Sequence, residues 1–318
     1  MLLQPLLNPD SEDRREVLEN APCARSAPDA EPVRAAGDRE SKRKLRRRRL
    51  AWLIGSILAA SVLLLVIVVG VMLFLARDTS SPYRVGQALE QFRLVQRRDD
   101  IGAGQGKDLP ITGVYVYSTE GSESASAPGL PASTAQYPVT TTMTVFSQGC
   151  GQDWRWQPLT DRYEDLVVCR SPNGSLMLQS RFDSVEFYRN ADRRNFACTD
   201  DSVFLPAHPR AGQVFAGTCS NAGNSNSGGL RIDYQGRVVG DDVLEIGGVS
   251  VNTVHLVVHE QMRGDTLGTG AESVWLDAGT GLVVKLTRIE ATRSQSAVGW
   301  VPSTESFSIE LRSLLPKT

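Results

Sequence analysis

The feature that most constrains this chain is a run of 27 residues without a charged side chain, from Leu50 to Ala76. As a helix, it is long enough to cross a hydrocarbon layer about 30 Å thick, and few buried helices of soluble proteins are so long and so apolar. A cleaved signal peptide fits less well. The run begins some fifty residues into the chain, no Ala-x-Ala site follows it, and no lipobox cysteine is present. The sequence therefore predicts a transmembrane helix over residues 50–76.

The charges beside this run predict its orientation. Ser41–Arg49 carries seven basic residues and no acid, whereas the first twenty residues after the run carry only Arg77, Arg84 and Arg93. The positive-inside rule then places residues 1–49 in the cytoplasm. Nucleic-acid binding is the alternative for such a basic cluster, but its position favours contact with anionic headgroups, and the net charge of −2 is nearly neutral. We expect a bilayer partner and no nucleic acid.

The composition changes along the chain predict four segments. Residues 1–49 form a basic cytoplasmic tail that we expect to be disordered, because residues 1–40 lack apolar periodicity. Residues 50–76 are the transmembrane helix, and residues 77–110 are a stalk or a short helix. Within that stalk, apolar residues at helical spacing over residues 85–98 allow either a spacer or a helix that packs on the next domain. Residues 111–318 form an extracytoplasmic domain.

The cysteines agree with this topology. Cys23 lies on the predicted cytoplasmic side, and the other four, Cys150, Cys169, Cys198 and Cys219, follow the membrane run. An even number on the oxidising side predicts two disulfides, with three pairings open, of which the sequential pairing closes the shortest loops. A metal site is disfavoured because no Cys-x-x-Cys pair is present.

From Ile111 onward, β-branched and aromatic residues alternate with polar ones, which is typical of half-buried strands. The stretch VWLDAGTGLVVKL, residues 274–286, contains a Gly-x-Gly that could bind phosphate. A phosphate loop needs a helix after it, however, and the alternation continues instead, so AGTG is expected to be a hairpin turn. We expect a mainly β fold, an antiparallel curved sheet or incomplete barrel of about ten strands.

The C-terminal strands resemble those of LolA-like domains, a group that includes lipoprotein-localisation factors and RseB/MucB-type periplasmic regulators. The resemblance covers residues 240–291, where GGVSVNTVHLVVHEQMRGD precedes ESVWLDAGTGLVVKLTRIE, with weaker support from GVYVYSTEG at residues 113–121. It implies an incomplete barrel around an apolar cavity that binds acyl chains or lipoproteins. This chain departs from the group in its membrane helix, its four outer cysteines and the absence of an evident lid helix.

Few residues suggest a catalytic or metal site. His255 and His259 would share a strand face about 13 Å apart, too far for one metal ion, and Ser250 lacks the setting of a nucleophile elbow. Adjacent carboxylates point to opposite faces of a strand and cannot form a dyad alone; these pairs are Glu164 with Asp165, Asp200 with Asp201, and Asp241 with Asp242. We expect no catalytic, metal or cofactor site.

Trp154 and Trp156 lie two residues apart beside Cys150. They could form an exposed aromatic patch that contacts a partner or ligand, or pack together on one buried sheet face. The function expected from these observations is a single-pass, membrane-anchored extracytoplasmic binding protein for a lipid or lipidated ligand, and not an enzyme. The alternatives are an envelope signalling or scaffold protein that binds a protein partner and, third, an extracytoplasmic hydrolase.

Overall fold

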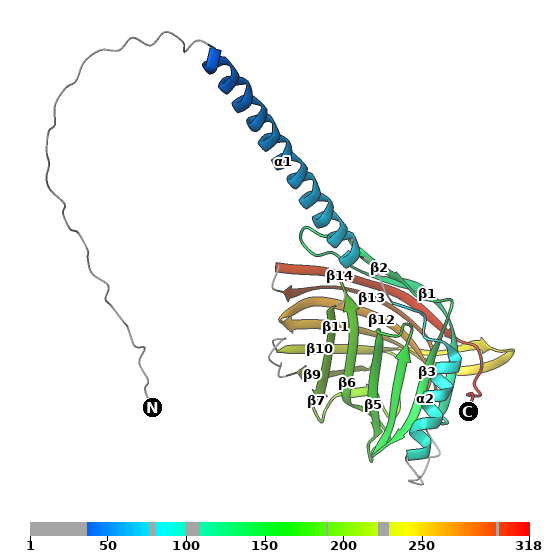
Figure 1. Ribbon diagram of the computed structural model, residues 1–318. Coiled ribbons are helices and arrows are strands. Elements are labelled where there is room, and N and C mark those ends of the chain that lie inside the picture. Colours follow the sequence, from blue (N-terminus) through cyan, green and yellow to red (C-terminus); the bar gives the residue numbers. More distant parts are fainter. Residues whose placement is uncertain (1–36, 77–79, 99–108, 189, 222–228, 297–298) are drawn as a thin grey trace, which may run out of the picture. The chain divides into compact units, whose positions relative to one another are not determined.

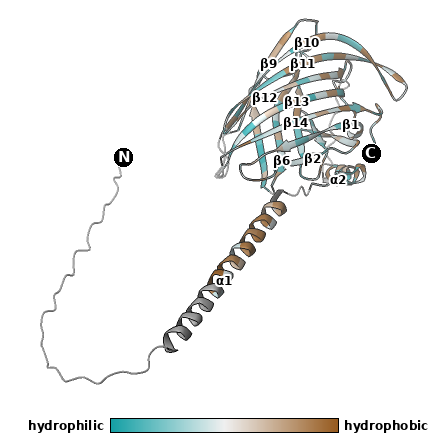
Figure 2. Cartoon of the chain, turned by 90° about the horizontal axis from the view of Figure 1, so that it is seen from above, coloured by the Kyte–Doolittle hydropathy of each residue, from teal (hydrophilic) through white to brown (hydrophobic). Residues whose placement is uncertain are grey.

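The structure is a computed structural model that describes residues 37–76, 80–98, 109–188, 190–221, 229–296 and 299–318. Helix α1 spans Gly37–Ala76. Within it, Trp52–Phe74 is the one helical segment of the described chain that is long and apolar enough to cross a membrane, and its side chains are exposed. Figure 2 shows this apolar stretch in brown.

Helix α1 begins earlier than the sequence suggested. The prediction of a disordered tail up to residue 49 is wrong for residues 37–49, which are helical and include the basic run. The reason is local: Lys, Arg and Glu are good helix formers, and neither Gly nor Pro interrupts residues 38–49. Residues 1–36, with Cys23, lie outside the described residues.

The remainder is one antiparallel sheet with a short helix, shown in Figure 1. The helix is α2, Val85–Arg98. The strands are β1 Gly113–Ala125, β2 Ser133–Gln136, β3 Thr140–Gln148, β4 Gly151–Gln157, β5 Tyr163–Arg170, β6 Leu176–Phe187, β7 Asn190–Cys198, β8 Val203–Leu205, β9 Val214–Asn221, β10 Leu230–Ile246, β11 Val249–Gly264, β12 Thr266–Asp277, β13 Val283–Ser296 and β14 Gly299–Leu311.

The sheet closes into a barrel of twelve strands, so the expectation of an incomplete barrel with about ten strands is wrong. Strand β14 pairs with β1 over nine residue pairs, from Tyr117 with Leu311 to Ala125 with Ser303, while β2 and β8 lie outside the ring. At Gly121, a Cβ atom would lie only 2.3 Å from the Ser306 carbonyl oxygen, so the residue permits close approach of the two strands. Closure removes both exposed sheet edges.

Helix α2 packs on the outer face of the barrel. Ala88 and Phe92 of the helix are buried against Val114 of β1 and Phe146 of β3, and the Phe92 and Phe146 rings lie 5.9 Å apart. Of the two alternatives for residues 85–98, the structure therefore has the packed helix, which lies outside the lumen.

The four outer cysteines form two disulfides in the sequential pairing, Cys150 with Cys169 and Cys198 with Cys219. The second lies at the seam between β7 and β9, where the described residues form two pairs, one of which is the two cysteines themselves. The first joins the end of β5 to the residue before β4, where those strands already share six pairs. The Cys198–Cys219 bond thus links β7 and β9 covalently.

The AGTG stretch is the predicted hairpin turn between β12 and β13. Trp275 pairs with Lys285 across it, and Gly281 has a positive φ of 79°, a conformation that favours glycine. No helix follows the turn, so the phosphate-loop alternative is excluded here.

Candidate functional site: the open half of the barrel lumen

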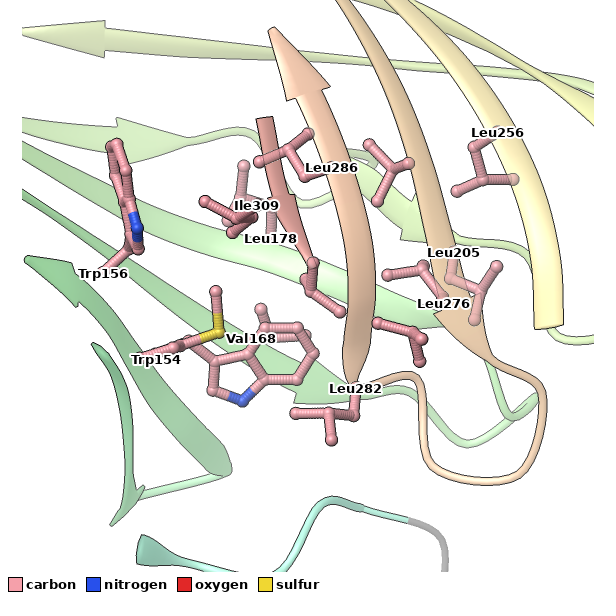
Figure 3. Close-up of a cluster of buried hydrophobic side chains, with 14 of the residues drawn as sticks. Trp154, Trp156, Val168, Leu178, Leu205, Leu256, Leu276, Leu282, Leu286 and Ile309 are labelled. Atoms are coloured by element: carbon pink, nitrogen blue, oxygen red, sulfur yellow. The ribbon is translucent and has the colours of Figure 1, made fainter. Parts of the chain in front are cut away.

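One half of the barrel lumen is filled with apolar side chains. Figure 3 shows Trp154 and Trp156 of β4 facing Leu276, Leu286 and other residues of the opposite wall. Trp156 stacks on Phe307 of β14, with 4.4 Å between ring centroids, and Trp154 is 1% exposed. We call this region the packed half.

Moving along the same strands, the inward-facing residues become smaller and more polar. On β12, Val274 and Leu276 give way to Gly268 and Gly270, since every second residue faces inward. On β13 the corresponding residues are Thr292 and Ser294, and on β14 Ser303. Short side chains cannot fill a lumen of this width, so the barrel stays open at this end.

A layer of ion pairs separates the two halves. Arg288 of β13 contacts Glu164 of β5 at 2.6 Å and also pairs with Glu272. Arg181 of β6 contacts Glu164 at 3.2 Å, and its further partners are Asp183 and Glu260. We call these residues, together with Arg162 and its partners, the ion-pair layer.

Arg162, in the connection between β4 and β5, extends this layer to β1 and β14. It lies 3.3 Å from Glu123 of β1 and 3.0 Å from Glu305 of β14. Its guanidinium lies over the Trp156 ring, as that of Arg288 lies over Phe307, at 5.9 and 5.4 Å from the centroids. The arginines therefore cover the aromatic end of the packed half while they pair with acids above it.

The pKa values in the layer reflect burial and pairing. Burial alone would raise the pKa of Glu164, but Arg181 and Arg288 together hold it below its ordinary value. For Glu272, burial dominates, and its pKa is raised although Arg288 opposes the shift. Glu164 is thus the carboxylate whose charge the layer most depends on.

Above the layer lies a cavity of about 820 Å³, large enough for a small-molecule ligand. Its walls differ in chemistry. Strands β6, β7, β10 and β11 contribute most of its apolar side chains, which are Val185, Phe187, Ala191, Phe196, Leu230, Ile232 and Met262, beside the charged Arg181, Asp183, Asp192, Arg193 and Arg194 of β6 and β7. Strands β12, β13, β14 and β1 contribute a polar wall: Thr266, Glu290, Thr292, Ser294, Ser303, Glu305 and Glu123. The cavity therefore suits an amphiphilic ligand.

Three glutamates form a row across the polar wall. Glu290 of β13 lies opposite Glu305 of β14, which lies opposite Glu123 of β1. Like charges in direct cross-strand register destabilise a sheet unless they are compensated. Arg162 compensates Glu123 and Glu305, and the Tyr137 hydroxyl lies within hydrogen-bonding distance of both and can donate its one proton to either.

Glu290 differs from the other two glutamates. It is half-buried and lines the cavity, yet within the described structure it has no hydrogen bond or ion pair. Burial and the neighbouring Glu305 raise its pKa to about 8, an effect that Arg288 only partly offsets. Burial likewise raises the pKa of Glu123 to about 7, although Arg162 opposes the shift.

The β1–β2 loop borders the cavity with Ala127 and Leu130. Tyr188, in the β6–β7 turn, holds this loop. Its hydroxyl lies 2.9 Å from the carbonyl oxygens of Ala125 and Pro131, can donate to either, and accepts from the Ala127 amide. Tyr188 has a φ of 52°, which is unusual for a bulky side chain. The loop is thus fixed to the opposite wall by one residue.

The predicted aromatic contact residues do not lie on the surface. Trp154 and Trp156 are 1% and 5% exposed and belong to the main apolar core, so the interpretation as an exposed patch is wrong and that of core packing is confirmed. The physical reason is register: Gln152, Trp154 and Trp156 all face the lumen. The surface face of β4 instead carries Asp153 and Arg155.

The other sequence candidates are also placed. Glu164 faces the ion-pair layer while Asp165 pairs with Arg155, so this pair points to opposite faces as expected. His255 and His259 lie on β11, where the His255 ring stacks on Trp275 at 4.1 Å. Among the described residues, no group of three His, Cys, Asp or Glu side chains could hold a metal ion.

Sequence reasoning missed the lumen charges. Arg288 and Glu290 share a strand face with Leu286, which is deeply buried, and that period of two was the available signal. It was overlooked because charged residues in a strand normally mark the solvent face.

Comparison with known proteins does not identify a family for this chain. No protein-family model matches the chain, and no curated protein matches it. Among solved structures it is similar to the hypothetical lipoprotein YmcC from Escherichia coli (K12), at 13% identity over 75% of this chain and 99% of that chain, with a TM-score of 0.29. The similarity assigns neither a family nor a ligand, and the resemblance to LolA-like domains stays a prediction.

Proposed function

We propose that this chain is a single-pass, membrane-anchored extracytoplasmic protein that binds a lipid or another amphiphilic molecule in the open half of its barrel. The role is binding and not catalysis. The observation that carries the proposal is the cavity of about 820 Å³, in which most apolar side chains come from β6, β7, β10 and β11 and mainly polar ones come from β12, β13, β14 and β1. Burial of the ligand's apolar surface against those apolar side chains would supply about 25 cal/mol per Å² removed from water.

The placement outside the cytoplasm rests on two independent features. The disulfides Cys150–Cys169 and Cys198–Cys219 are typical of an oxidising compartment. The basic run before Trp52–Phe74 favours a cytoplasmic N-terminus, which would put the barrel on the other side of the bilayer. Accessibility of an epitope tag at each terminus in intact cells tests this topology.

The binding role is tested by filling the cavity. Ser303→Trp would place an indole in the lumen, whereas Ser306→Trp on the same strand points outward and serves as the control. The full chain and both variants are purified from membranes, extracted with organic solvent and analysed by mass spectrometry. We expect one amphiphile to accompany the wild type and Ser306→Trp and to be lost from Ser303→Trp. Identical extracts from three folded proteins would contradict the proposal.

A further inference from the structure

Among the acidic side chains that line the described cavity, one has no ion-pair partner. Arg162 is used by Glu123 and Glu305, and Arg194 of β7 is used by Asp192 and Asp265 at 2.8 Å each. Arg181 serves several acids at once. Among the cavity-lining acids of the described chain, Glu290 is the one without a hydrogen bond or ion pair.

The cavity lining as a whole has more acidic than basic side chains. It contains six carboxylates and four guanidinium groups, and one of the four, Arg193, is exposed. Arg181 is also shared with Glu164 below the cavity. The Glu290 pKa of about 8 means that this carboxyl keeps its proton at neutral pH in the empty lumen. A cationic ligand group would favour the ionised form and pair with it, whereas an anionic group would oppose its ionisation.

We propose that the ligand of this lumen carries a protonated amine or guanidinium that pairs with Glu290, and an apolar part that lies against the wall formed by β6, β7, β10 and β11. This inference rests on the proposed function and narrows its ligand class. It disfavours a simple fatty acid, whose one polar group is an anion.

The position of Glu290 suits this role. The carboxylate lies on the polar wall above the ion-pair layer, at the boundary between charged side chains and the hydroxyls of Thr292 and Ser294. The charged groups that act on it are Glu305 of β14 and Glu260 of β11, which oppose its ionisation, and Arg288 of β13 and Arg181 of β6, which favour it. Because both arginines already pair with other acids, an incoming cation would not have to displace an internal partner of Glu290.

The test uses three probes that share one apolar part: 4-phenylbutylamine, 4-phenylbutanol and 4-phenylbutyrate. Binding to the full chain in lipid nanodiscs is measured by calorimetry at pH 8, with protein-free nanodiscs as the blank. We expect the amine to bind about tenfold more tightly than the alcohol, since a charge-assisted hydrogen bond is worth more than a neutral one, and the carboxylate to bind most weakly.

Two variants assign the effect to one residue. Glu290→Gln keeps the side-chain shape and should reduce the amine to the affinity of the alcohol. Glu120→Gln removes a carboxylate from the exposed face of β1 and should leave the preference unchanged. Thermal unfolding of each variant confirms that it is folded.

The outcomes separate the two proposals. Equal affinity for amine and alcohol in the wild type, or an amine preference that persists in Glu290→Gln, overturns the cationic-ligand inference and leaves lumenal binding intact. If none of the probes binds, and Ser303→Trp also fails to alter the organic extract, the proposed binding function fails as well.

Discussion

The packed half and the open half of the lumen are built from the same strands, yet side chains fill the first and leave a cavity in the second. In the packed half, Trp154, Phe307 and Leu286 fill the barrel, and that burial stabilises the closed ring. In the open half, Gly270, Thr292 and their neighbours leave the lumen unfilled. The comparison teaches that a closed barrel can obtain its stability at one end and keep the other end available for a ligand.

The largest expected effect is a change in the packed half. Trp154→Ala removes a side chain that is 1% exposed and should lower the free energy of unfolding by about 3 to 5 kcal/mol. Phe187→Ala, at one of the apolar side chains that line the cavity, should cost only about 1 kcal/mol because its ring is half-buried. Denaturant unfolding of the full chain, followed by circular dichroism, measures both. Equal losses would show that the two halves are packed alike.

The ion-pair layer should be the next most sensitive. Arg288→Met leaves Glu164 with one arginine fewer in a buried setting and should cost about 3 kcal/mol. The control, Arg231→Met, breaks the exposed pair with Asp233 and should cost less than about 0.5 kcal/mol. Both are read by denaturant unfolding, and a tolerated Arg288→Met would mean that the layer is not held by charge pairing.

Loss of each disulfide should affect amide exchange in a different part of the barrel. Replacing Cys198 and Cys219 by Ser should lower stability by about 2 to 3 kcal/mol and speed amide exchange in β7 and β9, because this bond links the two strands directly. Replacing Cys150 and Cys169 should leave exchange at this seam unchanged. Hydrogen exchange read by mass spectrometry separates these results, and protection of β7 and β9 in both variants would contradict this role of the Cys198–Cys219 bond.

The smallest effect is the pH dependence from Glu290. Its folded pKa of about 8 exceeds the ordinary value of 4.5, so the folded state holds a proton that the unfolded state has lost between these two pH values. Stability therefore falls as pH rises through that window. Glu290→Gln removes this dependence and should stabilise the ligand-free protein by about 1 kcal/mol at pH 9 while changing little near pH 4.

Thermal unfolding of wild type and Glu290→Gln at several pH values measures this difference. Glu123 titrates in both proteins, so its contribution cancels in the comparison. A difference that is independent of pH would show that Glu290 acts by packing and not by its charge.

Local features were predictable. The apolar run, the helix at residues 85–98, the hairpin after Asp277 and two disulfides all depend on residues close together in sequence or on simple counting. Ring closure was not predictable in this way, since β1 and β14 meet from opposite ends of the domain. Ile289 illustrates the limit: its side chain is 66% exposed, while its charged neighbours Arg288 and Glu290 face inward.

The sequence by itself determined that this chain carries a membrane-length helix, an antiparallel β domain and an even number of cysteines able to pair. Hydropathy and period-two alternation are local properties, so they survive without knowledge of the fold. Only the tertiary structure decided that the sheet closes, that Trp154 faces a core and that Glu290 faces a cavity. Those facts depend on which distant strands become neighbours, and alternation says only that two faces differ, not which one encloses the lumen.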